Sequence, residues 1–230
     1  PYFVKAWYTN KRKPIGIGNK IAIPATLDFE LWQGPAPRKP YQDNLVHYNW
    51  HWFWHWGTGE ACNNGTHEVD CARWFLGVDY ANKVNSTGGR YAAKDDWQTP
   101  DTQVAGWEFE GGKSIVWEGR SCNDYQIEGS GRGFIVHGDK GTLVNDGGGS
   151  YKVYDLDNKL MDTVDSKVVV DAANKVSPAA NLDKLHLDNF IESIRGNQTL
   201  NAPIVDAAKS VLLCHQANIS QRVGRTLHCD

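Results

Sequence analysis

Long apolar runs and an excess of one charge are both missing from this sequence. No stretch approaches the roughly 18 apolar residues of a membrane-spanning helix, so no membrane partner is expected. The chain holds 24 Lys and Arg against 27 Asp and Glu, and its one basic cluster is residues 11–13. A nucleic-acid-binding surface needs a broader basic patch, so no nucleic acid partner is expected either.

Familiar metal and cofactor motifs are missing as well. The 5 cysteines include no Cys-x-x-Cys pair, which argues against a zinc ribbon and against a disulfide framework. The glycines from Gly129 onward resemble a dinucleotide-binding fingerprint. However, Phe134 stands where the last glycine belongs, and the segment leads into a predicted strand rather than a helix. We therefore expect no cofactor-binding residue in this chain.

The start of the chain shows no signal peptide, because no charged segment followed by an apolar stretch occurs there. Instead, the residues from Pro1 to Tyr8 have the pattern of a strand. A chain that starts inside a strand is expected to be the C-terminal part of a longer protein. The compartment, cytoplasmic or exported, stays open, because a signal upstream of Pro1 would not be visible.

What the sequence does have is alternation, tight turns and aromatic residues. The 10 Trp and 23 Gly favour a β-rich protein. Alternating apolar and polar residues predict strands, and three- to four-residue spacing predicts helices. The predicted strands are 2–9, 83–91, 102–110, 113–121, 132–137, 142–145, 150–155 and 159–164. The predicted helices are the short segment 27–32 and the longer segments 63–76, 182–195 and 205–223.

The turns between the middle strands are short and rich in Gly, Asp and Asn, which makes neighbouring strands antiparallel. We predict an α+β fold with a large open, mostly antiparallel β-sheet and helices packed on one face. The 40% of hydrophobic residues can fill one large core, so residues 1–230 are expected to form a single domain.

The segment HYNWHWFWHWGTGEACNNGTHEVD, residues 47–70, has an unusual density of Trp and His. Its first part has a strand-like composition, and a strand would place Trp50, Trp52, Trp54 and Trp56 on one face. Three interpretations are open. The segment is a pocket for a polyhydroxylated ring, since Trp faces stack on sugar C–H groups. Alternatively, it is a Trp-lined core, or it is a metal site with ligands among His51, His55 and His67.

Asn63 and His67 are four residues apart on a predicted helix, so both side chains can point into one pocket. A histidine there can act as a general base, because its ordinary pKa lies near 6.5. Asp70, one turn later, can orient its ring. In the equally open structural interpretation, Asn63 caps the helix and His67 is a buried hydrogen-bonded residue.

Several motifs together resemble the C-terminal domain of the glucose–fructose oxidoreductase / inositol dehydrogenase (Gfo/Idh/MocA) family. They occur in order along nearly the whole chain: LWQGPAP (31–37), HYNWHWFW (47–54), NNGTHEVDCARW (63–74), HGDKGTL (137–143), HLDNFIESIRG (186–196) and CHQANISQRVGR (214–225).

The resemblance implies a two-domain enzyme that transfers a hydride between NAD or NADP and a sugar, cyclitol or related polyol. The cofactor is bound mainly by an N-terminal Rossmann domain, which also carries the family's catalytic Lys in Glu-Lys-Pro. That domain lies outside this chain, so the isolated chain is expected to be inactive. The sheet's outer face usually packs against another subunit, which implies a homo-oligomer.

The resemblance also assigns site residues. His67 matches the family's proton acceptor, and Asn63 stands where the family has Asp, so it can orient a ligand but not relay a proton. The substrate-binding residues implied or suggested are Trp52, Trp54, His55, Asp70, Arg120 and His186, with no metal ligand. The alternatives to an oxidoreductase domain are a non-catalytic carbohydrate-binding or assembly module and a metal-dependent hydrolase using His51, His55 and His67. A redox-neutral relative that uses NAD to cleave glycosidic bonds also fits the resemblance.

Overall fold

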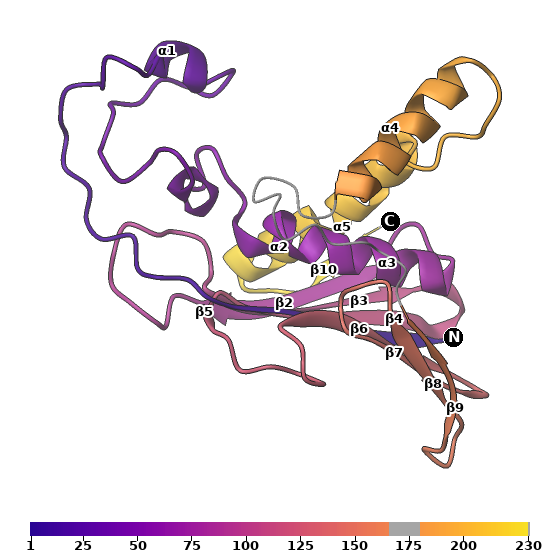
Figure 1. The fold of residues 1–230 in the computed structure, drawn as a ribbon. Helices are drawn as coiled ribbons and strands as arrows, with labels where there is room; N and C mark the ends of the chain where they lie inside the picture. The colour runs from indigo at the N-terminus through magenta and orange to yellow at the C-terminus, as the bar shows by residue number, and fades with distance from the viewer. Residues whose placement is uncertain (166–179, 230) are drawn as a thin grey trace.

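An open sheet with helices on only one of its faces organises this chain (Figure 1). The computed structural model describes residues 1–165 and 180–229. Within them the strands follow the order β10-β2-β3-β4-β1-β6-β7-β8-β9, and β5 pairs with β1 at the margin. Of the described pairs, β1 with β4 is parallel and the others are antiparallel. The predicted α+β fold with a mostly antiparallel sheet is confirmed.

The eight predicted strands begin and end close to their predicted bounds, and two short strands, β5 and β10, were not predicted. The strands are β1 (Phe3–Lys11), β2 (Lys83–Gly89), β3 (Thr102–Phe109), β4 (Lys113–Arg120), β5 (Cys122–Asn123), β6 (Arg132–Gly138), β7 (Gly141–Asn145), β8 (Tyr151–Tyr154), β9 (Leu160–Val164) and β10 (Leu227–His228).

The helices are α1 (Phe29–Trp32), α2 (Gly59–Asn63), α3 (Gly65–Leu76), α4 (Ala180–Ile194) and α5 (Ile204–Val223), with short 3₁₀ turns at Asn49–Trp52 and Glu110–Gly112. Both α3 and α5 end at a glycine in the left-handed conformation, Gly77 and Gly224, as expected for helix C-termini. None of the helices in the described part of the chain is long and apolar enough to cross a bilayer.

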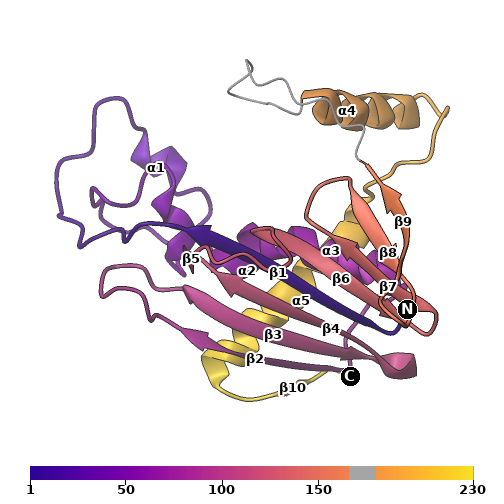
Figure 2. The ribbon, with the colours of Figure 1, turned by 60° about the horizontal axis from the view of Figure 1, so that its bottom comes forward.

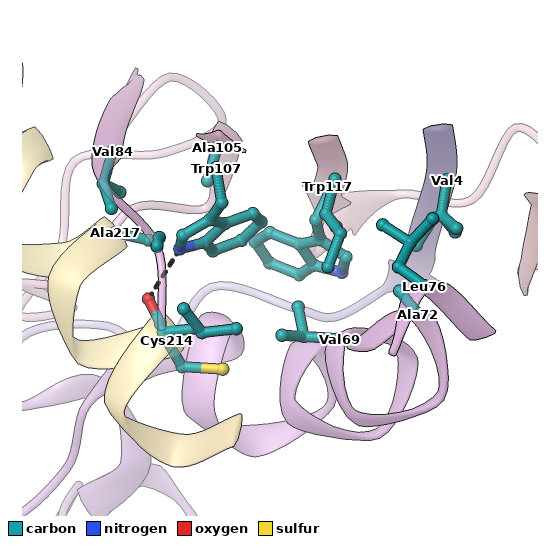
Figure 3. Close-up of a cluster of buried hydrophobic side chains, with 14 of the residues drawn as sticks. Val4, Val69, Ala72, Leu76, Val84, Ala105, Trp107, Trp117, Cys214 and Ala217 are labelled. Carbon is teal, nitrogen blue, oxygen red and sulfur yellow. Dashed lines mark hydrogen bonds between the residues drawn. The ribbon is translucent and has the colours of Figure 1, made fainter. Parts of the chain in front are cut away.

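The main core lies between the sheet and two helices (Figure 3). Helix α3 packs on β1, β4 and β6, and α5 packs on β2 and β3. Two fully buried tryptophans of the sheet, Trp107 and Trp117, fill the space beneath them. The Trp107 indole N–H donates to the Leu213 carbonyl of α5 at 3.0 Å, so its polar atom is satisfied inside the core. Burial of side chains this large contributes roughly 1.5–3 kcal/mol each.

Close contact between α3 and the sheet requires a glycine at the start of the helix. A Cβ on Gly65 would lie 2.8 Å from the Trp117 ring, which is closer than carbon atoms approach. Because Gly65 has no side chain, the first turn of α3 rests directly on that indole. This contact fixes the position of the residues that follow on α3.

Helix α4 does not cover the sheet, and this corrects the expectation that all three long helices would do so. Figures 1 and 2 show α4 standing away from the helix layer formed by α2, α3 and α5. The apolar residues that share one face of α4 are exposed: 58% for Leu187, 48% for Phe190, 43% for Ile191 and 68% for Ile194. The apolar spacing identified a helix correctly, but not what the helix packs against.

Between β1 and α2 the chain makes a long excursion, residues 12–58, which lies at the upper left of Figure 1 and is called the arm below. It has a small core of its own formed by Phe29, Tyr41, Leu45 and Phe53. The loop after β2 attaches the arm to the body. In this loop Trp97 stacks on Trp52 with ring centroids 4.0 Å apart.

Candidate functional site

The candidate site lies where the end of β1, the start of β6 and the junction of α2 with α3 meet. Tyr8 of β1 pairs with Arg132 of β6 in the sheet, so both side chains point to the helix-covered face at the same position along the strands. The polypeptide leaves β1 at this point and enters the arm. Side chains from four separate segments therefore converge here.

The junction between α2 and α3 is a break rather than the single predicted helix 63–76. Asn63 is the last residue of α2, and Asn64 separates the two helices. The interpretation of Asn63 as a helix cap is therefore wrong, because it ends a helix rather than beginning one. Its side-chain amide donates to Glu60 Oε1 at 3.0 Å and to the Tyr48 hydroxyl at 3.4 Å. These contacts hold Asn63 at the base of the arm.

His67, in the first turns of α3, has a solvent-exposed side chain, so it is not the buried residue of the structural interpretation. Partial desolvation and the positive charge of Arg132 lower the pKa of His67, while the Asp70 carboxylate opposes them. The imidazole is therefore neutral at neutral pH and can accept a proton. Asp70 affects the pKa of His67 through its charge rather than through a hydrogen bond to the ring. Its carboxylate accepts a hydrogen bond from Ser210 instead and lies 3.8 Å from Arg73.

A buried ion pair joins the start of the arm to α2. Arg12 Nε donates to Glu60 Oε2 at 2.9 Å, and the Ser121 hydroxyl donates to the same oxygen at 3.0 Å. The Arg12 guanidinium also lies 5.0 Å from the centroid of Trp52 and 5.4 Å from that of Tyr48. This stacking orders the aromatic segment over the site.

A second ion pair, of which only the carboxylate is buried, joins β6 to α3. Glu68 Oε1 accepts from Arg132 Nε at 2.9 Å and from Arg132 Nη2 at 2.6 Å. The guanidinium lies 5.4 Å from the centroid of the Tyr8 ring. Burial raises the pKa of Glu68 to about 7, against the opposing effect of Arg132. The second oxygen of Glu68, Oε2, is buried and has no hydrogen-bond partner among the described residues.

These groups border a hollow of about 340 Å³ next to His67, called the His67 hollow below. Its side-chain lining consists of His67, Glu68, Cys71, Arg132, Phe134 and Asn145. Burial raises the pKa of the Cys71 thiol, so that group is uncharged at neutral pH. A neutral base, a carboxyl that titrates near neutrality and an arginine thus share one small space.

The aromatic segment is not a strand, so the expectation of a Trp face is wrong. Residues 49–52 form a 3₁₀ turn, and Trp52 is only 1% exposed, which leaves its ring no free face for a ligand. Trp54 is partly exposed, and the Arg222 guanidinium of α5 lies 4.7 Å from its ring centroid. The composition of the segment suggested a strand, but contacts with the arm and with Trp97 determine its shape.

His55 belongs to the arm rather than to the His67 hollow. Its Nε2 lies 2.6 Å from the Pro37 carbonyl oxygen, and its ring meets Trp56 edge-on. It lines two hollows of the arm, of about 430 and 550 Å³. The second of these is mainly aromatic, with Trp32, Trp50 and Trp56 in its wall.

Arg120 and His186 lie apart from His67. Arg120 alternates with the buried, helix-facing Trp117 and Gly119, so it lies on the opposite face of the sheet, where it donates to Glu118, Asn123 and the Tyr125 carbonyl. His186 is an exposed residue of α4, the helix that stands away from the sheet. The structure therefore places Asn63 at the base of the arm and His67 at the His67 hollow, and Arg120 and His186 at neither.

The three histidines proposed as alternative metal ligands do not converge. In residues 1–165 and 180–229, no three side chains of His, Cys, Asp or Glu are placed to hold a metal ion. His51 Nδ1 lies 2.6 Å from the Tyr48 carbonyl oxygen, and His55 is bound to Pro37 within the arm. This geometry does not support a metal-dependent hydrolase.

Sequence reasoning missed Tyr8, Arg12, Glu60, Glu68 and Arg132 as members of the site. One signal was present: Tyr8 and Asn10 continue the face of β1 on which Val4 and Ala6 are buried, and Arg12 follows with the same spacing just after the strand. A polar continuation of an apolar strand face often marks the end of a core and the start of a site. The two ion pairs themselves left no local signal.

Comparisons with known proteins agree with this architecture. A model of an oxidoreductase family's C-terminal alpha/beta domain matches residues 22–228, which is most of the chain. No curated protein sequence matches.

Solved structures share the fold at low sequence identity. An NAD-binding oxidoreductase from Klebsiella pneumoniae has a TM-score of 0.66 at 14% identity, with 99% of this chain and 58% of that chain covered. An oxidoreductase from Thermotoga maritima has a TM-score of 0.62 at 12% identity, with 99% and 55% covered. The WlbA dehydrogenase from Bordetella pertussis, solved with NADH and UDP-GlcNAcA, has a TM-score of 0.59 at 17% identity, with 100% and 54% covered. The present chain thus spans a little over half the length of these proteins.

Proposed function

The chain belongs to the Gfo/Idh/MocA oxidoreductase family as a C-terminal α/β domain, and from this premise we propose that it binds the substrate of an NAD(P)-dependent oxidoreductase. The substrate is a sugar, a cyclitol or a related polyol. His67 is the proton acceptor for the hydroxyl that is oxidised. The observation that carries the proposal is an exposed histidine with a lowered pKa at the edge of a polar hollow.

The chemistry asked of His67 is acceptance of a proton from an alcohol as that carbon loses a hydride. A base is useful only when it is unprotonated, and the environment of His67 favours that form. Asn63 cannot ionise, so its part is to orient the substrate through its amide, which already donates to Tyr48 and Glu60. The nicotinamide, when bound, supplies the hydride acceptor or donor.

The cofactor is NAD or NADP, and it is held mainly by an N-terminal Rossmann domain that acts as the partner of this domain. The 230 residues contain no glycine-rich dinucleotide motif of their own. What this domain contributes is a neutral base and polar donors beside a concave surface. That donor set fits a nicotinamide-linked alcohol oxidation, in which the domain itself removes only a proton.

Aromatic and polar groups at the base of the arm suit a polyhydroxylated ring. Tyr48 is 47% exposed and is flanked by Arg12 and Asn63, while Trp54 presents part of its ring. Ring faces of this kind pack on sugar C–H groups, and the amide and hydroxyl groups bind sugar hydroxyls. Trp52, which is buried, supports these residues by stacking between Arg12 and Trp97.

The sheet face without helices is the proposed contact with another copy of the chain. Figure 2 shows this face of the central strands without a covering helix. Its outward positions include Val104, Val116 and Ile135, and Val104 is 40% exposed. Such a surface suits a homo-oligomer with a polar rim.

The proposal is tested on the intact protein. Reduction of NAD and of NADP is measured across a panel of sugars, sugar derivatives and cyclitols, together with binding of NADH and NADPH. We expect turnover with at least one member of the panel. Binding of a sugar with neither turnover nor nicotinamide binding would instead favour a non-catalytic carbohydrate-binding module. Nicotinamide-dependent cleavage of a glycoside without net reduction would identify the redox-neutral variant.

A further inference from the structure

Arg132 uses only one edge of its guanidinium within the protein. The edge formed by Nε and Nη2 is taken by a single oxygen of Glu68. The other edge, formed by Nη1 and the outer hydrogen of Nη2, has no hydrogen-bond partner for Nη1 in the part of the chain that the structure describes. A guanidinium edge with two parallel N–H groups matches a carboxylate or a phosphate.

The Arg132 side chain is accessible to solvent, whereas its partner Glu68 is not. The Arg132 side chain is 36% exposed and lines the His67 hollow, but the Glu68 side chain is only 4% exposed. Glu68 thus holds the guanidinium from the buried side. The Tyr8 ring lies at 5.4 Å and restricts the guanidinium further, so its direction is fixed before any ligand arrives.

The charge around Arg132 is incompletely balanced. Burial raises the pKa of Glu68 to about 7, so a part of this carboxyl is protonated at neutral pH and the Arg132 charge is then uncompensated. The nearby Glu60 carboxylate is occupied by Arg12, and Asp70 by Ser210 and Arg73. His67 and Cys71 are uncharged at neutral pH, for the reasons given above. The hollow therefore has a positive bias.

In the wall of the His67 hollow opposite α3, the main chain passes close to Arg132. Gly147 has φ +83°, and a Cβ there would lie 2.2 Å from Arg132 Cγ, so only glycine lets this loop pass over the arginine stem. Gly148 continues the same wall. Asn145 fixes the loop by donating to the Gly148 and Ser150 carbonyls. These contacts fix the shape of the His67 hollow between β6, β7 and α3.

We propose that the His67 hollow binds an anionic group, a carboxylate or a phosphate, on the free edge of Arg132. The proposal rests on the proposed function and narrows it, because it makes the substrate an acidic sugar or polyol. The anionic group anchors one end of the ligand, and His67 in the same hollow lies beside the rest. Arg132 then acts as a specificity-determining residue, and Glu68 as the residue that positions it.

The test is a titration of the 230-residue chain with glucuronate, glucose 6-phosphate and neutral glucose. Binding is followed by NMR through the Arg132 Nε–Hε signal and the His67 ring signals. At least one of the two acids is expected to bind about tenfold or more tightly than glucose, as for a hydrogen bond to a charged group. The tighter acid shows whether the group is a carboxylate or a phosphate.

Two variants are expected to move binding in opposite directions. Arg132→Gln should weaken acid binding about tenfold or more while leaving glucose binding unchanged. Glu68→Gln keeps an acceptor for Arg132 but removes the competing negative charge, so it should strengthen acid binding. If Arg132 and Glu68 only stabilised the fold, both variants would weaken acid binding. Arg195→Gln, which breaks the exposed pair with Glu192, serves as the matched control.

The double variant Arg132→Gln/Glu68→Gln removes both charges, so it tests anion binding without leaving a buried carboxylate unpaired. Acids that bind no better than glucose, or acid binding that survives both arginine variants, would overturn the inference. An intact enzyme that oxidises only neutral polyols would also overturn it while leaving the proposed function in place. The two proposals therefore fail separately.

Discussion

His67 and Glu68 are adjacent residues of α3 with opposite surroundings. His67 is exposed next to a positive charge, and Glu68 is buried with one arginine as its partner. Both environments disfavour the charged form, although one residue is a base and the other an acid. Neighbouring groups with shifted pKa values are typical of sites that transfer protons.

Glu68 should make the stability of the chain depend on pH in a defined direction. Its pKa is raised from 4.5 to about 7 in the folded state, so the folded chain keeps a proton that the unfolded chain has lost. This contribution is fully present below about pH 4.5 and is lost as pH rises through about 7. The shift corresponds to about 3 kcal/mol.

Urea unfolding of the wild type and of Glu68→Gln, at several values between about pH 4.5 and 8, checks this prediction. Relative to the wild type, the variant should gain about 3 kcal/mol in unfolding free energy as pH rises across that range. Parallel pH dependence of the two proteins would show that Glu68 has an ordinary pKa.

Trp52 and Trp54 are two residues apart but should respond differently to truncation. Trp52→Ala removes a fully buried ring that stacks on Trp97, and losses of this kind cost about 3–5 kcal/mol. Trp54→Ala removes a partly exposed ring and should weaken sugar binding with little loss of stability. Thermal unfolding and sugar titration of both variants separate the two effects. A Trp54→Ala protein that unfolds like Trp52→Ala would assign both rings to the core.

The residues of the site could be predicted only where their partners are close in sequence. Asn63, His67 and Asp70 were recognised from helix spacing, although Asp70 turned out to contact Ser210. The two ion pairs were not recognised, because Arg12 and Glu60 are 48 residues apart and Arg132 and Glu68 are 64 apart. A lone Arg in a strand has no local sign of a distant buried partner.

Among the elements, α3 depends most on a single small residue. Gly65→Ala would place a methyl group 2.8 Å from the Trp117 ring, so α3 or the ring must shift. Overpacking of this kind costs about 1–3 kcal/mol. The same shift displaces His67, so both stability and the His67 ring signals in NMR should change.

Gly138→Ala is the control for that variant, since a Cβ there meets its nearest atom at an ordinary 3.5 Å. It should leave stability within about 0.5 kcal/mol, as is usual for substitutions away from special features. Gly65→Ala with equal stability and unchanged His67 signals would mean that α3 does not rest on Trp117 as described.

Strands and long helices were predictable because alternation and helical spacing follow directly from the face that each element buries. Alternation also misled the prediction for the aromatic segment. Its alternating Trp and His suggested two faces, but the segment packs against the separate core of the arm and against Trp97. Long-range contacts of a loop leave no period in its sequence.

For the whole molecule, the fold class followed from the order of elements, but the arrangement of α4 did not. An apolar stripe predicts that a helix face packs against something, and it does not name the partner. The exposed face of α4 is the clearest example, because α4 stands away from the sheet (Figure 2).

The uncovered sheet face leads to a prediction about assembly. Val104 points outward from β3 and is 40% exposed. If this face joins two copies, Val104→Lys buries a charge at the contact and should shift the intact protein to monomer in analytical ultracentrifugation. Val211→Lys on α5 starts from the same 40% exposure and should leave the assembly unchanged. Equal oligomeric states for all three proteins would place the subunit contact elsewhere.

The most direct test of the central claim is the kcat of the intact protein with His67→Ala, measured with the substrate and nicotinamide cofactor found in the sugar panel. His215→Ala, an exposed histidine of α5, is the control. Loss of the proton acceptor should lower kcat about 10²-fold or more, with a much smaller change in KM. The control should keep the wild-type rate. A His67→Ala enzyme with unchanged kcat would remove His67 from the reaction and contradict the account.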